Sequence, residues 1–149
     1  MTPADTDFAQ RVRDSFGRQA VMATLGAALE TVEPGRVVLA MQHRPELTQQ
    51  HGFLHAGIVA TALDSACGYA AFTLMPADAA VLTIEFKTNL LAPARGPRFR
   101  FEGRVTKAGR TISVVDGRAV QLGEAGDEAL IATMTATVMT VLGREGLRM

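Results

Sequence analysis

The feature that most constrains the fold of this chain is a run of twenty residues, Ala56 to Met75, that contains one charged side chain, Asp64. By length the run could cross a membrane as a helix. Ala, Gly, Thr and Ser make up most of it, however, and a central Asp opposes insertion by roughly 2.5–3.5 kcal/mol. Small residues on all sides of a helix indicate close packing inside a protein. We therefore expect no membrane span, but a buried helix over about 56–74 that is wrapped by a sheet.

The segments before this helix predict helical and then paired extended structure. Phe8, Val12 and Phe16 recur every four residues behind a candidate cap at Thr6 or Asp7, which indicates a short amphipathic helix. A second short helix is expected over 19–25. The sequence "EPGR" at 33–36 fits a type II turn between strands near 27–32 and 36–43.

Alternating patterns after the long helix predict four more strands. The stretch "AVLTIEFKTNLLAP" sets Leu82, Ile84 and Phe86 against polar neighbours, as in a half-buried strand. "RFRFEGRVTK" and "TISVVDGRAVQL" follow, the latter with an expected bulge at Gly117. In the last strand, one face is expected to carry Ala132, Met134, Ala136, Val138 and Thr140. Consecutive strands joined by short turns predict an antiparallel meander and an α+β fold.

Composition narrows the class of protein. The 149 residues suit one domain, 1–149, whose first 26 residues form an N-terminal helical segment. Fifteen basic and fifteen acidic residues balance, which argues against a broad nucleic-acid surface. A lone cysteine, Cys67, excludes an internal disulfide framework and a Cys-rich zinc site. The polar N-terminus lacks the apolar core of a signal peptide, so a cytoplasmic location is expected.

The stretch "QQHGFLHAGIVATALDSACGYAA", which begins at Gln49, resembles the hotdog-fold acyl-CoA thioesterases of the phenylacetate-degradation (PaaI-like) type. Their pattern runs Asn or Gln, two residues, Gly, two residues, His-Gly-Gly, and then an acid on the following helix. Gln49 takes the amide position and His55 the histidine position, Ala56-Gly57 replaces Gly-Gly, and Asp64 is the acid. The resemblance implies a central helix wrapped by an antiparallel sheet of about five to six strands. It also implies a homodimer, or a dimer of dimers, whose sites lie at the subunit interface.

The start of the long helix has suitable chemistry for a thioester site. Backbone N–H groups in the first turn lack helical partners and carry the positive end of the helix dipole, so His55, Ala56 and Gly57 could form an oxyanion hole. Asp64 lies about two turns farther, roughly 10–14 Å at 1.5 Å per residue. That separation is too large for one helix to serve one thioester. Two antiparallel helices in a symmetric dimer would bring Asp64 of one chain near Ala56 of the other.

The resemblance assigns candidate roles to the site residues. Asp64 would activate water as a general base or attack the carbonyl as a nucleophile, and these two alternatives remain open. Gln49 would orient water or the thioester carbonyl, and Thr83 could hold the water. His55 could hydrogen-bond near the thioester or fix the loop. Each residue also has a structural alternative, because acids on apolar helices and threonines in strands are common without a catalytic role.

Three basic residues and four apolar or aromatic residues are further candidates for binding the substrate. Lys107 and Arg110 flank a turn and could meet the nucleotide end of coenzyme A, as could Arg95, although solvated turn charges are common. Met22, Phe53, Leu54 and Tyr69 are candidates for the acyl pocket. His43, His51 and His55 do not have helical spacing, so no metal is expected, and coenzyme A belongs to the substrate rather than to a resident cofactor.

The sequence therefore predicts an acyl-CoA thioesterase that releases an aromatic or medium-chain carboxylic acid. One alternative is a hotdog protein that binds acyl-CoA without turnover, against which Asp64 and Gln49 argue. Another is a hotdog dehydratase or hydratase, which needs a His-acid pairing in a motif that this chain lacks.

Overall fold

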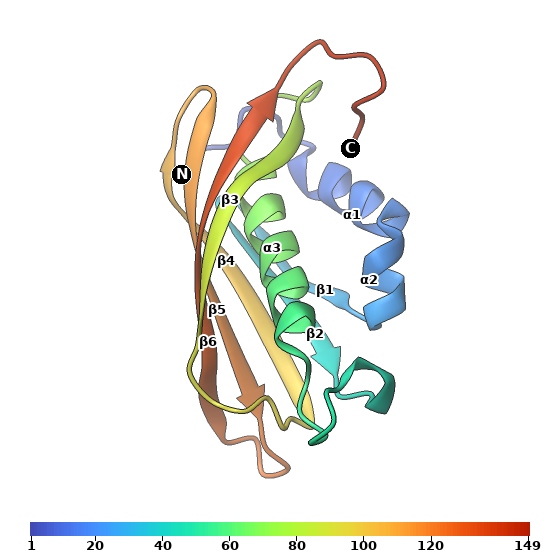
Figure 1. Ribbon diagram of the computed structural model, residues 1–149. Helices are drawn as coiled ribbons and strands as arrows, with labels where there is room; N and C mark the ends of the chain where they lie inside the picture. Colours follow the sequence, from blue (N-terminus) through green and yellow to red (C-terminus); the bar gives the residue numbers. More distant parts are fainter.

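The computed structural model describes all 149 residues, and its elements run in a simple order along the chain. Two short helices come first, then a strand pair, the long helix and four strands (Figure 1). Their bounds are α1 (Phe8–Arg18), α2 (Ala20–Leu25), β1 (Ala28–Glu33), β2 (Arg36–Gln42), the 3-10 turn η1 (Pro45–Leu47), α3 (Ala56–Phe72), β3 (Ala80–Leu90), β4 (Arg98–Ala108), β5 (Ile112–Leu122) and β6 (Glu128–Val141). The predicted α+β class, with a long helix on an antiparallel sheet, is confirmed.

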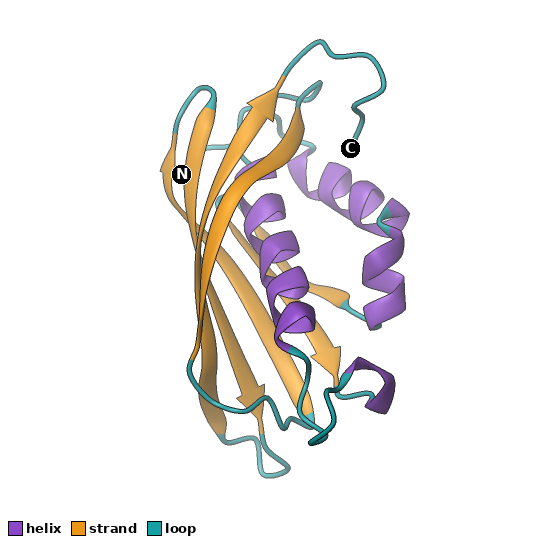
Figure 2. Ribbon diagram, in the orientation of Figure 1, coloured by secondary structure: helices purple, strands orange, loops and turns teal.

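Helix α3 lies against one face of the curved sheet, and α1 and α2 lie on the same side (Figure 2). The close approach depends on glycines in the strands beneath the helix. A Cβ on Gly103 of β4 would come within 2.7 Å of the Cys67 Cα and even nearer to the Ala66 carbonyl group. A Cβ on Gly117 of β5 would lie 3.0 Å from Cys67 Sγ. The small residues of α3 and the glycines of the strands beneath it therefore together allow the helix to lie close to the sheet.

The strand order is β1-β2-β4-β5-β6-β3, and all neighbours are antiparallel. The predicted meander is wrong at its first step, because β3 pairs with β6 rather than with β4. Residues 91–97 do not form a tight turn. They cross the end of the sheet beside the start of α3, where the Leu54 N–H donates to the Ala94 carbonyl oxygen at 3.0 Å. The crossover leaves β3 as an edge strand.

Strand β3 departs from the predicted half-buried alternation in two ways. A register shift between Thr83 and Glu85 breaks the period, so that Thr83 pairs with Val138 and Phe86 with Ala136. Both partners are buried against α3, and residues directly opposite each other share a face, so Thr83 and Phe86 both face the helix side. Ile84 and Phe86 are 53% and 44% exposed, because β3 has a neighbour on one side only.

Two further details concern the last strands. Gly117 stands in regular register with Gly103 and Met134, so the bulge predicted there is wrong. The β5–β6 pairing shifts register between Ala119 and Val120 instead, where Ile131 of β6 is the extra residue. The predicted inner face of β6 is confirmed, because Ala132, Met134, Ala136, Val138 and Thr140 are all buried. None of the helices has both the length and the apolar character that a membrane crossing requires.

Candidate active site at the two ends of the exposed face of α3

Asp64 lies in the middle of α3, where its carboxylate meets the edge strand. Thr83 Oγ1 donates a hydrogen bond of 2.7 Å to Asp64 Oδ1, so the structure brings these two predicted site residues together. Both border a cavity of about 310 Å³, which we call the Asp64 hollow; Ser65, Gly68, Tyr69 and Met149 are among its other lining residues. The carboxylate is partly accessible and is oriented by one hydroxyl group, which leaves Oδ2 without a protein donor.

The N-terminus of α3 is capped by its own preceding residue. His55 is the N-cap, and its Nδ1 accepts a hydrogen bond of 2.8 Å from the Gly57 N–H. The Gly57 N–H is therefore occupied, whereas the Ala56 N–H has no protein acceptor. All three residues are exposed. The His55 N–H is also occupied, because it donates to the Leu47 carbonyl oxygen at 3.0 Å. Of the three residues predicted for an oxyanion hole, only Ala56 has a free N–H in this chain.

Gln49 begins the loop that leads into α3. Its Oε1 accepts hydrogen bonds from the backbone N–H groups of His51 and Phe53, which folds the loop around the side chain. Gly52 makes the turn possible because its φ of 84° is favourable only for glycine. Gln49 also lines a cavity of about 500 Å³, the Gln49 hollow, together with His55 and Ala56.

The two hollows are separate within one chain and share no lining residue. Asp64 follows Ala56 by eight residues, or about 12 Å along the helix axis. Gly57, Thr61 and Asp64 lie on one stripe of α3 that is not fully buried, and apart from Asp64 the stripe is uncharged and small. The structure therefore unites Asp64 with Thr83, and Gln49 with His55 and Ala56, but it does not bring the two groups together.

Gln19 and Met149 are two of the lining residues of the Asp64 hollow that the sequence did not predict. Gln19, between α1 and α2, accepts a hydrogen bond of 2.7 Å from Ser65 Oγ through its Oε1, and Met149 reaches the hollow from the far end of the chain. No local pattern connects either residue with Asp64, so only the tertiary fold reveals them.

The four candidates for the acyl pocket lie in three different places in the structure. Phe53 and Leu54 line the Gln49 hollow, and Tyr69 lines the Asp64 hollow. Met22 lines neither of them. It is 1% exposed because its side chain packs into the core from the short helix α2.

Cys67 is unsuited to act as a nucleophile. It is fully buried, and burial together with the negative charges of Asp64 and Asp116 raises the pKa of its thiol to about 12. The three histidines do not converge either, and the structure contains no group of three or more His, Cys, Asp or Glu side chains placed to hold a metal ion.

The basic residues considered for coenzyme A occupy different ends of the molecule. Lys107 and Arg110 are exposed at the β4–β5 turn and line neither hollow. Arg95 lies beside the Gln49 hollow, where its guanidinium group stacks 4.8 Å above the centre of the Phe53 ring. Among the three, Arg95 is the residue that this chain places next to predicted site residues.

Comparisons with known proteins agree on the family. Residues 51–126 match the model of the Thioesterase superfamily, which is just over half of the chain. A crystal structure of a thioesterase family protein from Silicibacter pomeroyi is 61% identical, with a TM-score of 0.89 over 91% of this chain and 99% of that one. The medium/long-chain acyl-CoA thioesterase YigI of Salmonella typhimurium is 29% identical over 130 residues, which are 77% of this chain and 81% of that protein.

The fold is shared more widely than the sequence. The PaaI protein from the phenylacetic acid degradation operon of E. coli has a TM-score of 0.82 over 92% of this chain and 95% of its own, at 17% identity. Fold and family together define a hotdog-fold thioester hydrolase. The chain belongs to the thioesterase superfamily, as its resemblance to PaaI-like proteins predicted.

Proposed function

We propose that this protein hydrolyses an aromatic or medium-chain acyl-CoA to the carboxylic acid and free coenzyme A, in a homodimer whose sites each use both chains. The observation that carries the proposal is the separation of two complementary half-sites along one exposed stripe of α3. One half-site has the oriented carboxylate of Asp64, and the other has the free N–H of Ala56 beside Gln49. The acyl-CoA class is supported by the relationship to YigI.

Asp64 supplies the reactive carboxylate. With Oδ1 held by Thr83, Oδ2 is available to accept a proton from water as the water oxygen bonds to the thioester carbonyl carbon. The same oxygen could instead attack the carbonyl carbon and form an anhydride, which water then hydrolyses. Both routes expel the coenzyme A thiolate from the tetrahedral intermediate, and the present geometry is compatible with each.

The partner chain supplies the oxyanion donor. The Ala56 N–H lies at the positive end of the α3 dipole and has no protein acceptor, so it can donate to the carbonyl oxygen as that oxygen becomes negative. Gln49 adds its NH₂ group as a second donor at the same place. His55 holds the loop and the first turn through its bond to Gly57.

A two-fold dimer with antiparallel α3 helices would join the half-sites. The stripe of Gly57, Thr61 and Asp64 has small side chains that allow a second helix to approach closely. The exposed side chain of Phe86 lies beside it on the helix side of β3 and adds apolar area to the contact. Such an isologous contact places Asp64 of each chain near Ala56 of the other, twice per dimer.

Coenzyme A enters as part of the substrate, and the proposed steps use water, side chains and the backbone N–H of Ala56. Its phosphates need cations at the protein surface. Arg95 is one candidate, because it stacks on Phe53 beside the Gln49 hollow, and Lys107 and Arg110 are candidates through the partner chain.

The test is release of free thiol from benzoyl-CoA, phenylacetyl-CoA and straight-chain acyl-CoAs by the wild type and by Asp64→Asn. We expect the wild type to hydrolyse part of this panel, and the substitution to lower kcat/KM by about a hundredfold or more, because an acid–base group is removed. Near-normal turnover by Asp64→Asn would contradict the role of Asp64. No release by folded, dimeric wild type would contradict the proposed reaction.

A further inference from the structure

Gly68 is a glycine of α3 that neither the backbone conformation nor the packing of this chain requires. It is buried in the helix interior, one turn beyond Asp64, and its φ is not positive. A Cβ at this position would meet no atom within 4 Å beyond its chain neighbours and the adjacent helix backbone. Glycine is the least favourable residue in a helix interior after proline. Nothing within the chain thus explains the choice of glycine, and the space beside it is open to a ligand.

Other glycines at comparable positions have a structural reason. Those of β4 and β5 beneath α3 admit the helix backbone, and a Cβ on Gly57 would lie 3.1 Å from His55 Nδ1, the atom that caps the helix. Gly17 of α1 also has open space at its Cβ position, but it is exposed to solvent near the end of its helix. Gly68 differs because its open space belongs to the Asp64 hollow.

The Asp64 hollow places this space beside the proposed reactive carboxylate. Val81 and Leu82 of β3 also line the hollow. Its polar side chains have hydrogen-bond partners within the chain, in the pairs Asp64–Thr83, Ser65–Gln19 and Tyr69–Ser15. Its volume of about 310 Å³ is near the lower end of the range of about 300–1,000 Å³ for small-molecule pockets. The hollow therefore suits a compact group rather than a long chain.

The parts of an acyl-CoA differ in what they require of the protein. The phosphates need cations, and the lining of the Asp64 hollow contains no Lys or Arg side chain. Arg95, by contrast, stacks on Phe53 beside the Gln49 hollow. With the thioester carbonyl group between Asp64 and the partner's Ala56, the Asp64 hollow suits the acyl group, and the coenzyme A part extends away from it.

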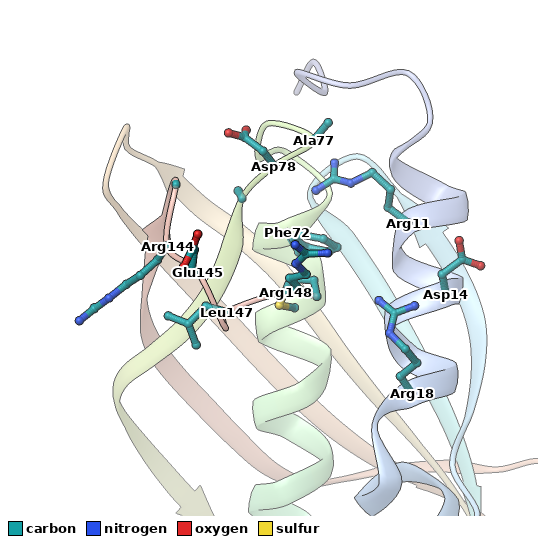
Figure 3. A pocket seen from close by; sticks show the side chains of 13 residues that line it. Arg11, Asp14, Arg18, Phe72, Ala77, Asp78, Arg144, Glu145, Leu147 and Arg148 are labelled. Atoms are coloured by element: carbon teal, nitrogen blue, oxygen red, sulfur yellow. The ribbon is translucent and has the colours of Figure 1, made fainter.

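A larger cavity of about 590 Å³, between α1 and the segment that follows β6, is less suited to an acyl group. Charged side chains form most of its lining, and Figure 3 shows Arg18 pointing into it from α1. Its apolar lining residues Phe72 and Ala79 are only 2% and 4% exposed. It also lacks Asp64 and Thr83, whereas the Asp64 hollow contains both.

We propose that the Asp64 hollow is the acyl pocket, and that Gly68 is a specificity-determining residue because its missing side chain leaves room for the acyl group beside the carboxylate. This inference rests on the proposed acyl-CoA substrate. It narrows that substrate to compact acyl groups, such as phenylacetyl and hexanoyl groups.

The test compares wild type, Gly68→Ala and Gly68→Leu on acetyl-CoA, hexanoyl-CoA and phenylacetyl-CoA. A side chain at position 68 enters the space that the larger acyl groups need. The ratio of kcat/KM for the better of the two larger substrates to that for acetyl-CoA should therefore fall roughly tenfold in Gly68→Ala, as expected for one carbon in an apolar pocket, and further in Gly68→Leu. An unchanged ratio in both variants, with hydrolysis by the wild type, would overturn the inference and leave the proposed function standing.

Gly17→Ala is the matched control, because it adds the same methyl group to another open position in a helix. It should leave the ratio within twofold of wild type. Both alanine variants should keep or raise the urea midpoint of unfolding, since alanine favours a helix and neither methyl group meets an atom. A lower midpoint in Gly68→Ala would mean that packing requires the glycine. Loss of the dimer in either Gly68 variant, measured by ultracentrifugation, would mean that a second copy fills the space. Either result would overturn the inference.

Calorimetric binding to Asp64→Asn, with and without Gly68→Leu, gives a readout that does not need turnover. Free coenzyme A has no acyl group, so Gly68→Leu should weaken binding of phenylacetyl-CoA and hexanoyl-CoA at least tenfold and leave the affinity for free coenzyme A within twofold. Equal changes for all three ligands, or no binding of either acyl-CoA, would overturn the inference. A wild type that hydrolyses nothing contradicts the proposed reaction instead, so the two failures are distinguishable.

Discussion

The single carboxylate in the apolar helix is stabilised by its position at the edge of the fold. Asp64 is partly accessible, and the Thr83 hydroxyl group donates to it across the gap between α3 and β3. A buried, unpaired carboxylate would be costly, whereas one hydrogen bond and partial exposure stabilise this one. The register shift beside Thr83 turns that hydroxyl toward the helix.

The Thr83–Asp64 bond gives a prediction about catalysis. Thr83→Val removes the donor but keeps the shape, and hydrogen bonds to charged groups contribute about 1.5–3 kcal/mol, so kcat should fall by roughly tenfold or more. Thr83→Ser keeps the hydroxyl group and should retain most activity. The measurement is kcat of both variants on the best substrate of the panel. Equal kcat values for Thr83→Val and Thr83→Ser would contradict a role for the hydroxyl group.

Individual site residues differ in how far the sequence could predict them. Gln49, His55, Ala56 and Asp64 lie within sixteen consecutive positions, so their spacing alone made them candidates. Their catalytic roles remain predictions. Met149 could not be predicted, because its place beside Val81 depends on how the segment after β6 folds back onto β3.

At the scale of elements, the close packing of α3 on the sheet depends on glycines, which have no side chain. Gly103 and Gly117 lie directly beneath Ala66 and Cys67, and their alternation pattern was visible in the sequence. The alternation predicted which face of β4 is buried, and Phe99, Phe101 and Val105 are indeed at most 5% exposed. The pattern did not reveal that a helix backbone lies within van der Waals contact.

Gly103→Ala should therefore destabilise the protein. The added methyl group would overlap the Ala66 carbonyl group and the Cys67 Cα, both of which belong to backbone that cannot move alone, so α3 must shift. Overpacking of this kind costs about 1–3 kcal/mol in the free energy of unfolding, measured by urea denaturation. Gly17→Ala in α1 is the control, because nothing lies within 4 Å of its Cβ position, and it should be neutral or slightly stabilising.

The strand order was harder to predict than the strands themselves. Apolar and polar residues alternate with a period of two in each strand sequence. As predicted, β4, β5 and β6 pair in sequence as antiparallel neighbours. Residues 91–97 contain two prolines and are longer than a tight turn, so the chain crosses the end of the sheet instead. This crossover places β3 at the edge and exposes apolar residues that the sequence pattern assigned to a half-buried strand.

At the scale of the whole molecule, the edge strand β3 exposes an apolar surface that a partner chain could cover. Ile84, Phe86 and Leu90 are 53%, 44% and 58% exposed on an edge strand, which is a surface that proteins usually cover. The small stripe of α3 continues this surface on the helix side. A second copy of the chain is the partner that the proposed shared site requires.

Phe86→Asp should convert the proposed dimer into a monomer, because it puts a charge into an apolar contact. Analytical ultracentrifugation measures the change, and circular dichroism should remain as in the wild type. Hydrolysis should fall at least about a hundredfold, since a monomer contains no complete site. Lys87→Asp is the control on the opposite face of the same strand, where Lys87 pairs with Thr135, and it should stay dimeric. A dimeric Phe86→Asp would place the interface elsewhere.

The measurement that tests the shared site most directly mixes two inactive variants, Asp64→Asn and Gln49→Ala, after exchange of subunits has been verified with tagged chains. In each heterodimer, one site carries both substitutions and the other carries neither. Random exchange makes half of the dimers hybrid, so the account predicts recovery of about a quarter of wild-type thiol release. Verified hybrids with no recovered activity would contradict it, because Asp64 and Gln49 would then have to serve the same site from one chain.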